Sequence, residues 1–177
     1  MSKRVFLSLI PVLALVMALA VARTSQAKDM FEEEVDKEAL SVKLAREAVK
    51  GGYPLMTVAE LKAAMDAKKP MLIVDTMPYE ASYKKEHVPG AVAFEFPIEP
   101  MPEWDAAKTG GKTVKDFEAL LGPDKNRALV FYCGFVKCTR SDNGALWAKK
   151  LGYTNVVRFP GGIYAWKGAG YPVEAVK

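Results

Sequence analysis

Two kinds of stretch alternate along most of the chain. Short apolar runs at residues 71–74, 92–96, 128–132 and 155–159 are typical of buried strands, and residues 55–57 add a weaker candidate. Between them, amphipathic stretches with capping signals predict helices at 58–67, 79–85, 113–121, 141–151 and 163–167. This alternation predicts an α/β domain with a central, mostly parallel five-stranded sheet and helices on both faces.

The first 52 residues lie outside this alternation. Lys3 and Arg4 precede an apolar core at 5–22, and small residues lead to Ala27, which predicts a signal peptide at 1–27 and export to a periplasm. The alternative is an uncleaved membrane anchor, because the apolar run is close to spanning length. Residues 28–52 predict an amphipathic helical extension without a catalytic pattern. It would pack on the domain at 53–177 or on a second subunit of a homodimer.

The charge of the chain argues against a nucleic-acid partner. Three of its 25 basic residues, Lys3, Arg4 and Arg23, lie in or beside the signal segment, which leaves 22 against 21 acidic residues. The mature protein is therefore nearly neutral. One histidine and two cysteines do not furnish a usual zinc site, and there is no phosphate-binding glycine loop or dinucleotide motif. We expect neither metal nor cofactor.

Both cysteines lie where the apolar run at 128–132 meets a helix. Cys133 ends the run, and the loop that follows holds Lys137, Cys138 and Arg140. The strand would fix the thiol at the rim of the sheet, where loop amides and the positive helix end favour a thiolate. A Cys133–Cys138 disulfide would close a very short loop, so it would be redox-active rather than a structural staple. The alternative for Cys133 is an inert buried cysteine.

Motifs on both sides of Cys133 resemble those of rhodanese domains. The second half of such a domain is matched by Val-Phe-Tyr-Cys133, by Arg140-Ser141, by Pro160-Gly-Gly-Ile-Tyr-Ala-Trp166 and by Gly170-Tyr-Pro-Val173. Leu72-Ile-Val-Asp75 and His87-Val-Pro-Gly-Ala91 resemble the first half. The resemblance spans residues 55–173, nearly all of the predicted mature chain.

The resemblance implies a sulfurtransferase that carries sulfane sulfur as a persulfide on Cys133. It implies that thiosulfate or polysulfide binds the loop that follows, which consists of Gly134, Phe135, Val136, Lys137, Cys138, Thr139 and Arg140. A thiol or a partner protein would accept the sulfur. Seven positions separate Cys133 from Arg140, two more than in the family's usual loop. This number also differs from the spacing between the cysteine and the arginine in phosphatases on the same fold. Met77 also stands where the family often has an arginine after Asp75. The longer loop suits a bulkier donor such as polysulfide.

Several roles stay open from the sequence. Cys138 is a resolving thiol, a sulfur relay or a small buried residue. The whole protein is alternatively a non-catalytic carrier of sulfur or a chalcogen oxyanion, or a thiol-redox protein that uses Cys133 and Cys138. Lys137 binds the donor or is a solvated charge, and Arg140 binds it or pairs with a nearby aspartate.

Other polar and aromatic residues have a structural alternative. His87 could form a dyad with Cys133, but its motif favours a structural turn. Asp75 is expected to be a structural acceptor at its strand end. Three aromatic side chains line the pocket mouth or simply pack: Tyr79, Trp104 and Phe135.

Overall fold

The computed structural model describes residues 29–176 of the chain, so the predicted signal peptide and its alternative as an anchor lie outside the described residues. Within the described part, no helix is both long enough and apolar enough to cross a membrane. The predicted extension forms helix α1 (Met30–Gly51). From Asp36 onward the described chain forms one compact unit, which includes most of α1.

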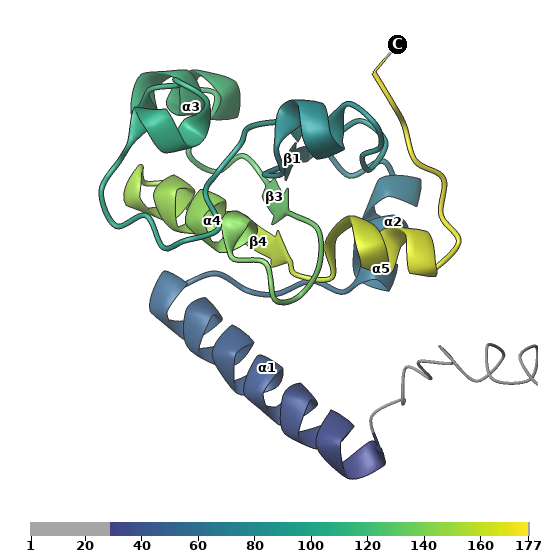
Figure 1. The fold of residues 1–177 in the computed structure, drawn as a ribbon. Coiled ribbons are helices and arrows are strands. Elements are labelled where there is room, and N and C mark those ends of the chain that lie inside the picture. The colour runs from purple at the N-terminus through teal and green to yellow at the C-terminus, as the bar shows by residue number, and fades with distance from the viewer. Residues whose placement is uncertain (1–28, 177) are drawn as a thin grey trace, which may run out of the picture. The chain divides into compact units, whose positions relative to one another are not determined.

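In the described part of the chain, four parallel strands form the sheet, which confirms the α/β fold (Figure 1). Their order is β2-β1-β3-β4, with bounds β1 (Leu72–Asp75), β2 (Val92–Ala93), β3 (Leu129–Tyr132) and β4 (Val156–Phe159). The expectation of a fifth strand was wrong in detail. Leu55 makes only an isolated bridge with Arg158, because Thr57 already caps the next helix through a capping box with Glu60.

Helices cover both faces of the sheet, and successive residues of each strand point alternately into two apolar cores. Val74 and Phe131 face the core under α3 (Val114–Leu121) and α4 (Arg140–Lys150). Ile73 and Val130 face the core under α2 (Val58–Asp66) and α5 (Gly162–Gly168). β3 is buried along its whole length, so it is a rigid support for the residue that follows it, Cys133.

The connections contain less helix than the sequence predicted. The stretch after Pro78 forms a single wide turn, η2 (Tyr79–Tyr83), and the long proline-rich loop holds a short 3₁₀ helix, η3 (Ala106–Thr109). Trp104 packs against Phe117 and Trp147, with ring centroids 5.8 and 5.0 Å away. It therefore belongs to the core around α3 rather than to a pocket mouth.

Candidate functional site

The thiol of Cys133 lies beneath the loop that joins β3 to α4. Its sulfur is 3.3 Å from the carbonyl oxygen of Cys138 and 3.9 Å from that of Phe135, and both contacts use the thiol as donor. The hydroxyl oxygen of Ser141, in the first turn of α4, lies 3.3 Å away on another side. Cys133 is fully buried. The end of β3 and the start of α4 thus hold one sulfur between them.

Cys138 folds back over this thiol. Its amide donates to the carbonyl of Phe135 at 2.9 Å, which closes a tight turn, and its side chain is only 2% exposed. The Cys133 thiol and the amides of Arg140 and Gly134 act on the Cys138 sulfur, and each favours its ionised form. The pKa of Cys138 is lowered to about 6, first by the Cys133 thiol and then by these amides.

Cys138 is therefore the more acidic of the two thiols. Burial raises the pKa of Cys133, and the neighbouring Cys138 raises it further, whereas the hydroxyl and amide of Ser141 lower it. We expected the loop amides to surround Cys133, but the carbonyls of Phe135 and Cys138 face its sulfur.

The start of α5 packs behind the loop and holds its backbone in place. The amide of Ile163 donates to the carbonyl of Cys133 at 2.9 Å, and that of Tyr164 donates to Gly134 at 3.0 Å. Gly162 has a φ of +59°, and a Cβ there would lie 2.1 Å from the Cys133 carbonyl oxygen. Gly162 is therefore needed so that the start of α5 can approach the loop backbone.

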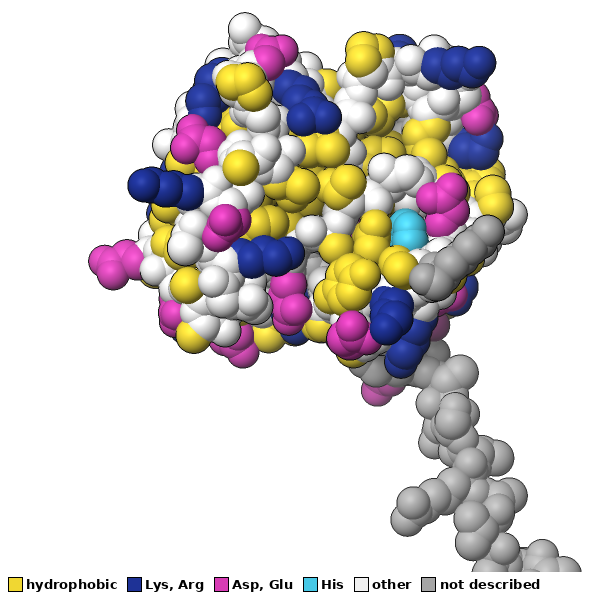
Figure 2. Space-filling model, turned by 90° about the horizontal axis from the view of Figure 1, so that it is seen from above, with side chains coloured by type: hydrophobic (Ala, Val, Ile, Leu, Met, Phe, Trp, Pro, Cys, Tyr) yellow, Lys and Arg dark blue, Asp and Glu magenta, His cyan; other side chains and the backbone are white. Residues whose placement is uncertain are grey.

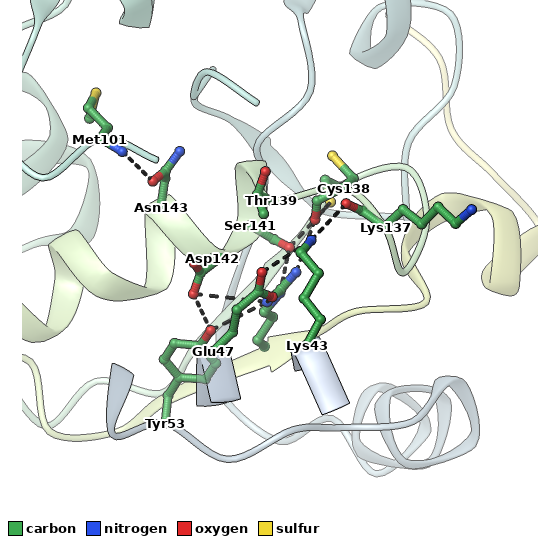
Figure 3. A network of polar contacts seen from close by, with 12 residues as sticks. Lys43, Glu47, Tyr53, Met101, Lys137, Cys138, Thr139, Ser141, Asp142 and Asn143 are labelled. Carbon is green, nitrogen blue, oxygen red and sulfur yellow. Dashed lines mark hydrogen bonds and ion pairs between the residues drawn. The ribbon is translucent and has the colours of Figure 1, made fainter. Parts of the chain in front are cut away.

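The side chains expected to bind the donor point in different directions. Arg140 donates to the carbonyl of Phe96 and, among the described residues, forms no ion pair with Asp75 or Asp142. Lys137 is exposed, and its side chain extends away from Cys138 (Figure 3).

The remaining loop side chains are anchors or surface residues. Thr139 donates to the carbonyl of Ile98. Phe135 and Val136 are exposed, and the Phe135 ring lies 5.4 Å from that of Tyr164. The loop thus brings two sulfurs and backbone amides together, while its cations lie at the edge.

His87 does not form a dyad with Cys133. Its Nδ1 lies 2.8 Å from the carbonyl oxygen of Tyr83, and its Nε2 lies 3.8 Å from a carboxylate oxygen of Glu174. Its ring also stacks on Tyr83. Both nitrogens are engaged away from the cysteines, which agrees with the structural turn that its motif predicted.

Asp75 is buried at the end of β1, the strand beside β3. Its Oδ1 accepts from the amide of Met77 at 2.8 Å, whereas Oδ2 has no hydrogen-bond partner among the described residues. Burial raises the pKa of Asp75 to about 6, and the charge of Cys138 contributes to this rise. Asp75 is thus a buried titratable group near Cys138 rather than a fully satisfied acceptor.

Two residues around the loop were missed by the sequence analysis. Asn143 in α4 donates to the carbonyls of Pro97 and Glu99 at 2.9 and 2.8 Å, which ties down the loop after β2. Arg158 is fully buried in β4 and donates to Ser141 Oγ at 2.9 Å and to the Cys138 carbonyl at 3.0 Å. For Arg158, the sequence offered one signal, which was its position as a charged residue within the apolar run at 155–159.

Solved structures of other proteins share this fold. A thiosulfate sulfurtransferase from Pseudomonas aeruginosa is 19% identical with a TM-score of 0.57, and the match covers 78% of this chain and 23% of that protein. The BH2092 protein from Bacillus halodurans is 21% identical with a TM-score of 0.52, and the match covers 77% and 87%. At these identities the likeness concerns the fold alone.

Sequence comparisons are more specific. Rhodanese-like domain-containing protein 14, a chloroplastic protein of Arabidopsis thaliana, is 31% identical over 134 residues, covering 60% of this chain and 58% of the relative. The chain thus spans a little over half the length of that relative, and about a quarter of the Pseudomonas protein. The family described as Rhodanese-like domain matches residues 57–169. The chain therefore belongs to the rhodanese-like domain family.

Proposed function

We propose that this protein is a sulfurtransferase that carries sulfane sulfur as a persulfide on Cys133. The observation that supports this most directly is the Cys133 thiol, held at the end of β3 by contacts to Ser141 and to the loop. Family membership supports the same chemistry, and the Pseudomonas protein of the same fold is a thiosulfate sulfurtransferase. We propose thiosulfate or polysulfide as the donor.

The reaction begins with the loss of the Cys133 proton. The resulting thiolate, which the Ser141 hydroxyl stabilises, attacks the outer sulfur of the donor. The bond between that sulfur and its neighbour breaks, so thiosulfate leaves as sulfite and a polysulfide leaves one sulfur shorter. A thiolate or cyanide then attacks the outer persulfide sulfur, and Cys133 leaves as a thiolate. Atoms and electrons balance without a cofactor.

The sequence also supports a proposal for the location and the partners of the protein. We propose export to a periplasm through the signal segment, and transfer of sulfur to a thiol or protein acceptor there. Figure 2 shows basic and acidic side chains interspersed around apolar ones on one face of the molecule, without a broad basic patch. This pattern supports a protein or small-molecule acceptor rather than nucleic acid.

The test is to find which cysteine gains a sulfur atom. Wild type, Cys133→Ser and Cys138→Ser are each treated with thiosulfate or polysulfide and mapped by mass spectrometry, and the release of sulfite is timed. We expect one added sulfur on Cys133 in wild type and in Cys138→Ser, and none in Cys133→Ser. Sulfur on Cys138 instead, with Cys133→Ser still active, would contradict the assignment.

The closeness of the two thiols favours a second candidate function, the release of hydrosulfide. In this reaction the Cys138 thiolate attacks the inner persulfide sulfur of Cys133. The bond to the outer sulfur breaks, hydrosulfide leaves, and a Cys133–Cys138 disulfide forms. The sulfane sulfur is reduced while the two thiols are oxidised, so an external dithiol must reduce the disulfide afterwards. One equivalent of sulfide released without dithiol, and lost in Cys138→Ser, would distinguish this function from transfer to an acceptor.

A further inference from the structure

Arg158 is a charged side chain placed directly behind the thiol pair. A guanidinium group has only donors, so Ser141 Oγ must accept from Arg158 Nε, 2.9 Å away. The hydroxyl hydrogen of Ser141 is then available for the Cys133 sulfur, 3.3 Å from Oγ. Arg158 therefore determines in which direction the hydroxyl of Ser141 donates.

The same guanidinium also acts on the carbonyl that faces Cys133. The Cys138 carbonyl oxygen accepts from Arg158 Nη2 at 3.0 Å and from the Cys133 thiol at 3.3 Å. When Cys133 ionises, its donation to this oxygen is lost, and the thiolate then faces a partial negative charge. The charged donor Nη2 offsets that repulsion, since it polarises the carbonyl from the other side.

A buried arginine needs counter-ions, and the nearest comes from the helical extension. Glu47 in α1 contacts Arg158 Nη1 at 2.6 Å, while Asp142 lies 3.9 Å from the same nitrogen. Burial lowers the pKa of Arg158, but Glu47 and Tyr53 more than offset this, so the pKa is raised and Arg158 stays charged.

The helical extension also reaches the loop itself. Lys43, one turn before Glu47, pairs with that carboxylate at 3.2 Å and donates to the carbonyl of Lys137 at 3.2 Å (Figure 3). The sequence of residues 28–52 shows no catalytic pattern, and it does not reveal these contacts. In the structure, α1 touches both the loop and the arginine behind it.

We propose that Glu47 and Arg158 are positioning residues for Cys133: their ion pair holds the Ser141 hydroxyl and the Cys138 carbonyl so that a thiolate on Cys133 is stabilised. The inference deepens the proposed sulfur transfer and rests on Cys133 as its nucleophile. Without the Glu47 carboxylate, the guanidinium is drawn toward Asp142, and its contact with Ser141 weakens. The helical extension thereby becomes part of the catalytic apparatus.

The test measures the pKa of Cys133 by the ultraviolet absorbance of its thiolate, in full chains that carry Cys138→Ala so that one thiol titrates. The variants are Glu47→Gln, Ser141→Ala and the two combined. Glu38→Gln, the same change on the exposed part of α1, is the control. We expect Glu47→Gln and Ser141→Ala each to reduce the thiolate fraction about tenfold, a pKa rise of roughly one unit. If the two substitutions acted independently, the double variant would lose thiolate fraction about a hundredfold. We expect a much smaller loss, because both substitutions disrupt the same contact.

A Cys133 pKa unchanged by Glu47→Gln, or a fully additive double variant, would overturn the proposal. Thermal unfolding is followed alongside, because a purely structural role would lower the melting temperature without moving the pKa. If Glu47→Gln does not fold, Arg158→Lys replaces it: one ammonium cannot contact Glu47, Ser141 and the Cys138 carbonyl together, so the pKa should rise again. The titration uses no sulfur donor, whereas failure of the proposed function appears separately as wild type that forms no persulfide.

Discussion

The hydroxyl oxygen of Ser141 lies 3.3 Å from the sulfur of Cys133. A hydroxyl that donates to a thiolate stabilises it, and this contact lowers the pKa of a thiol that burial raises. Ser141→Ala should therefore slow single-turnover persulfide formation about tenfold at neutral pH, the effect of roughly one pKa unit. Sulfite release measured across pH should show the variant approaching the wild-type rate as Cys133 becomes fully ionised. A rate ratio that stays constant with pH would argue against this role.

Gly162, the first residue of α5, gives a prediction about the shape of the loop. Gly162→Ala should destabilise the fold by about 2 kcal/mol or more and abolish persulfide formation, because the new Cβ collides with backbone at a positive φ. Gly168→Ala, at the other end of α5, adds a Cβ with no heavy atom within 4 Å. It should change stability by less than about 0.5 kcal/mol. Urea unfolding and the persulfide assay check both variants, and equal effects would contradict the argument.

Much of the fold was predictable because local signals and tertiary structure agree. The apolar runs that precede Asp75 and Cys133 became adjacent parallel strands, with Asp75 paired to Tyr132. Thr57 and Thr113 cap their helices through capping boxes. The strand predicted at 55–57 does not form, because the capping box of Thr57 starts a helix immediately. Too few residues are left before that helix to pair as a strand.

The site was less predictable because its supporting contacts join distant parts of the chain. Glu47 and Arg158 are 111 positions apart, and an amphipathic helix pattern does not show which carboxylate will find a buried partner. The position of Cys133 could be predicted from the strand that precedes it. The path of the longer loop, which turns Cys138 toward Cys133, depends on contacts made by the start of α5 and by Arg158.

The buried ion pair between Arg158 and Glu47 predicts non-additive stability effects. Arg158→Met should destabilise the protein by about 3–5 kcal/mol, because it leaves a carboxylate with 14% side-chain exposure without its closest cation. Adding Glu47→Gln should recover part of this loss, since the second change removes the uncompensated charge. Urea unfolding of the single and double variants measures the coupling. A double variant as unstable as the sum of the singles would show that the pair is not coupled.

Asp75 predicts a particular dependence of stability on pH. Its pKa is raised from an ordinary value of 3.8 to about 6 in the folded protein, first by burial. Between these values the folded state keeps a proton that the unfolded state has lost. The stabilisation is therefore complete below about pH 4 and is lost as the pH rises through about 6.

Asp75→Asn removes this titration while it keeps an oxygen to accept from the amide of Met77. The unfolding free energy of the variant minus that of wild type should therefore rise by up to about 3 kcal/mol between about pH 4 and pH 8. Urea unfolding at several pH values measures this difference, and other titrating groups cancel because both proteins carry them. The buried amide adds a cost that does not depend on pH, so the change with pH is the decisive quantity. A difference that stays flat across this range would mean that Asp75 keeps an ordinary pKa beside the thiols.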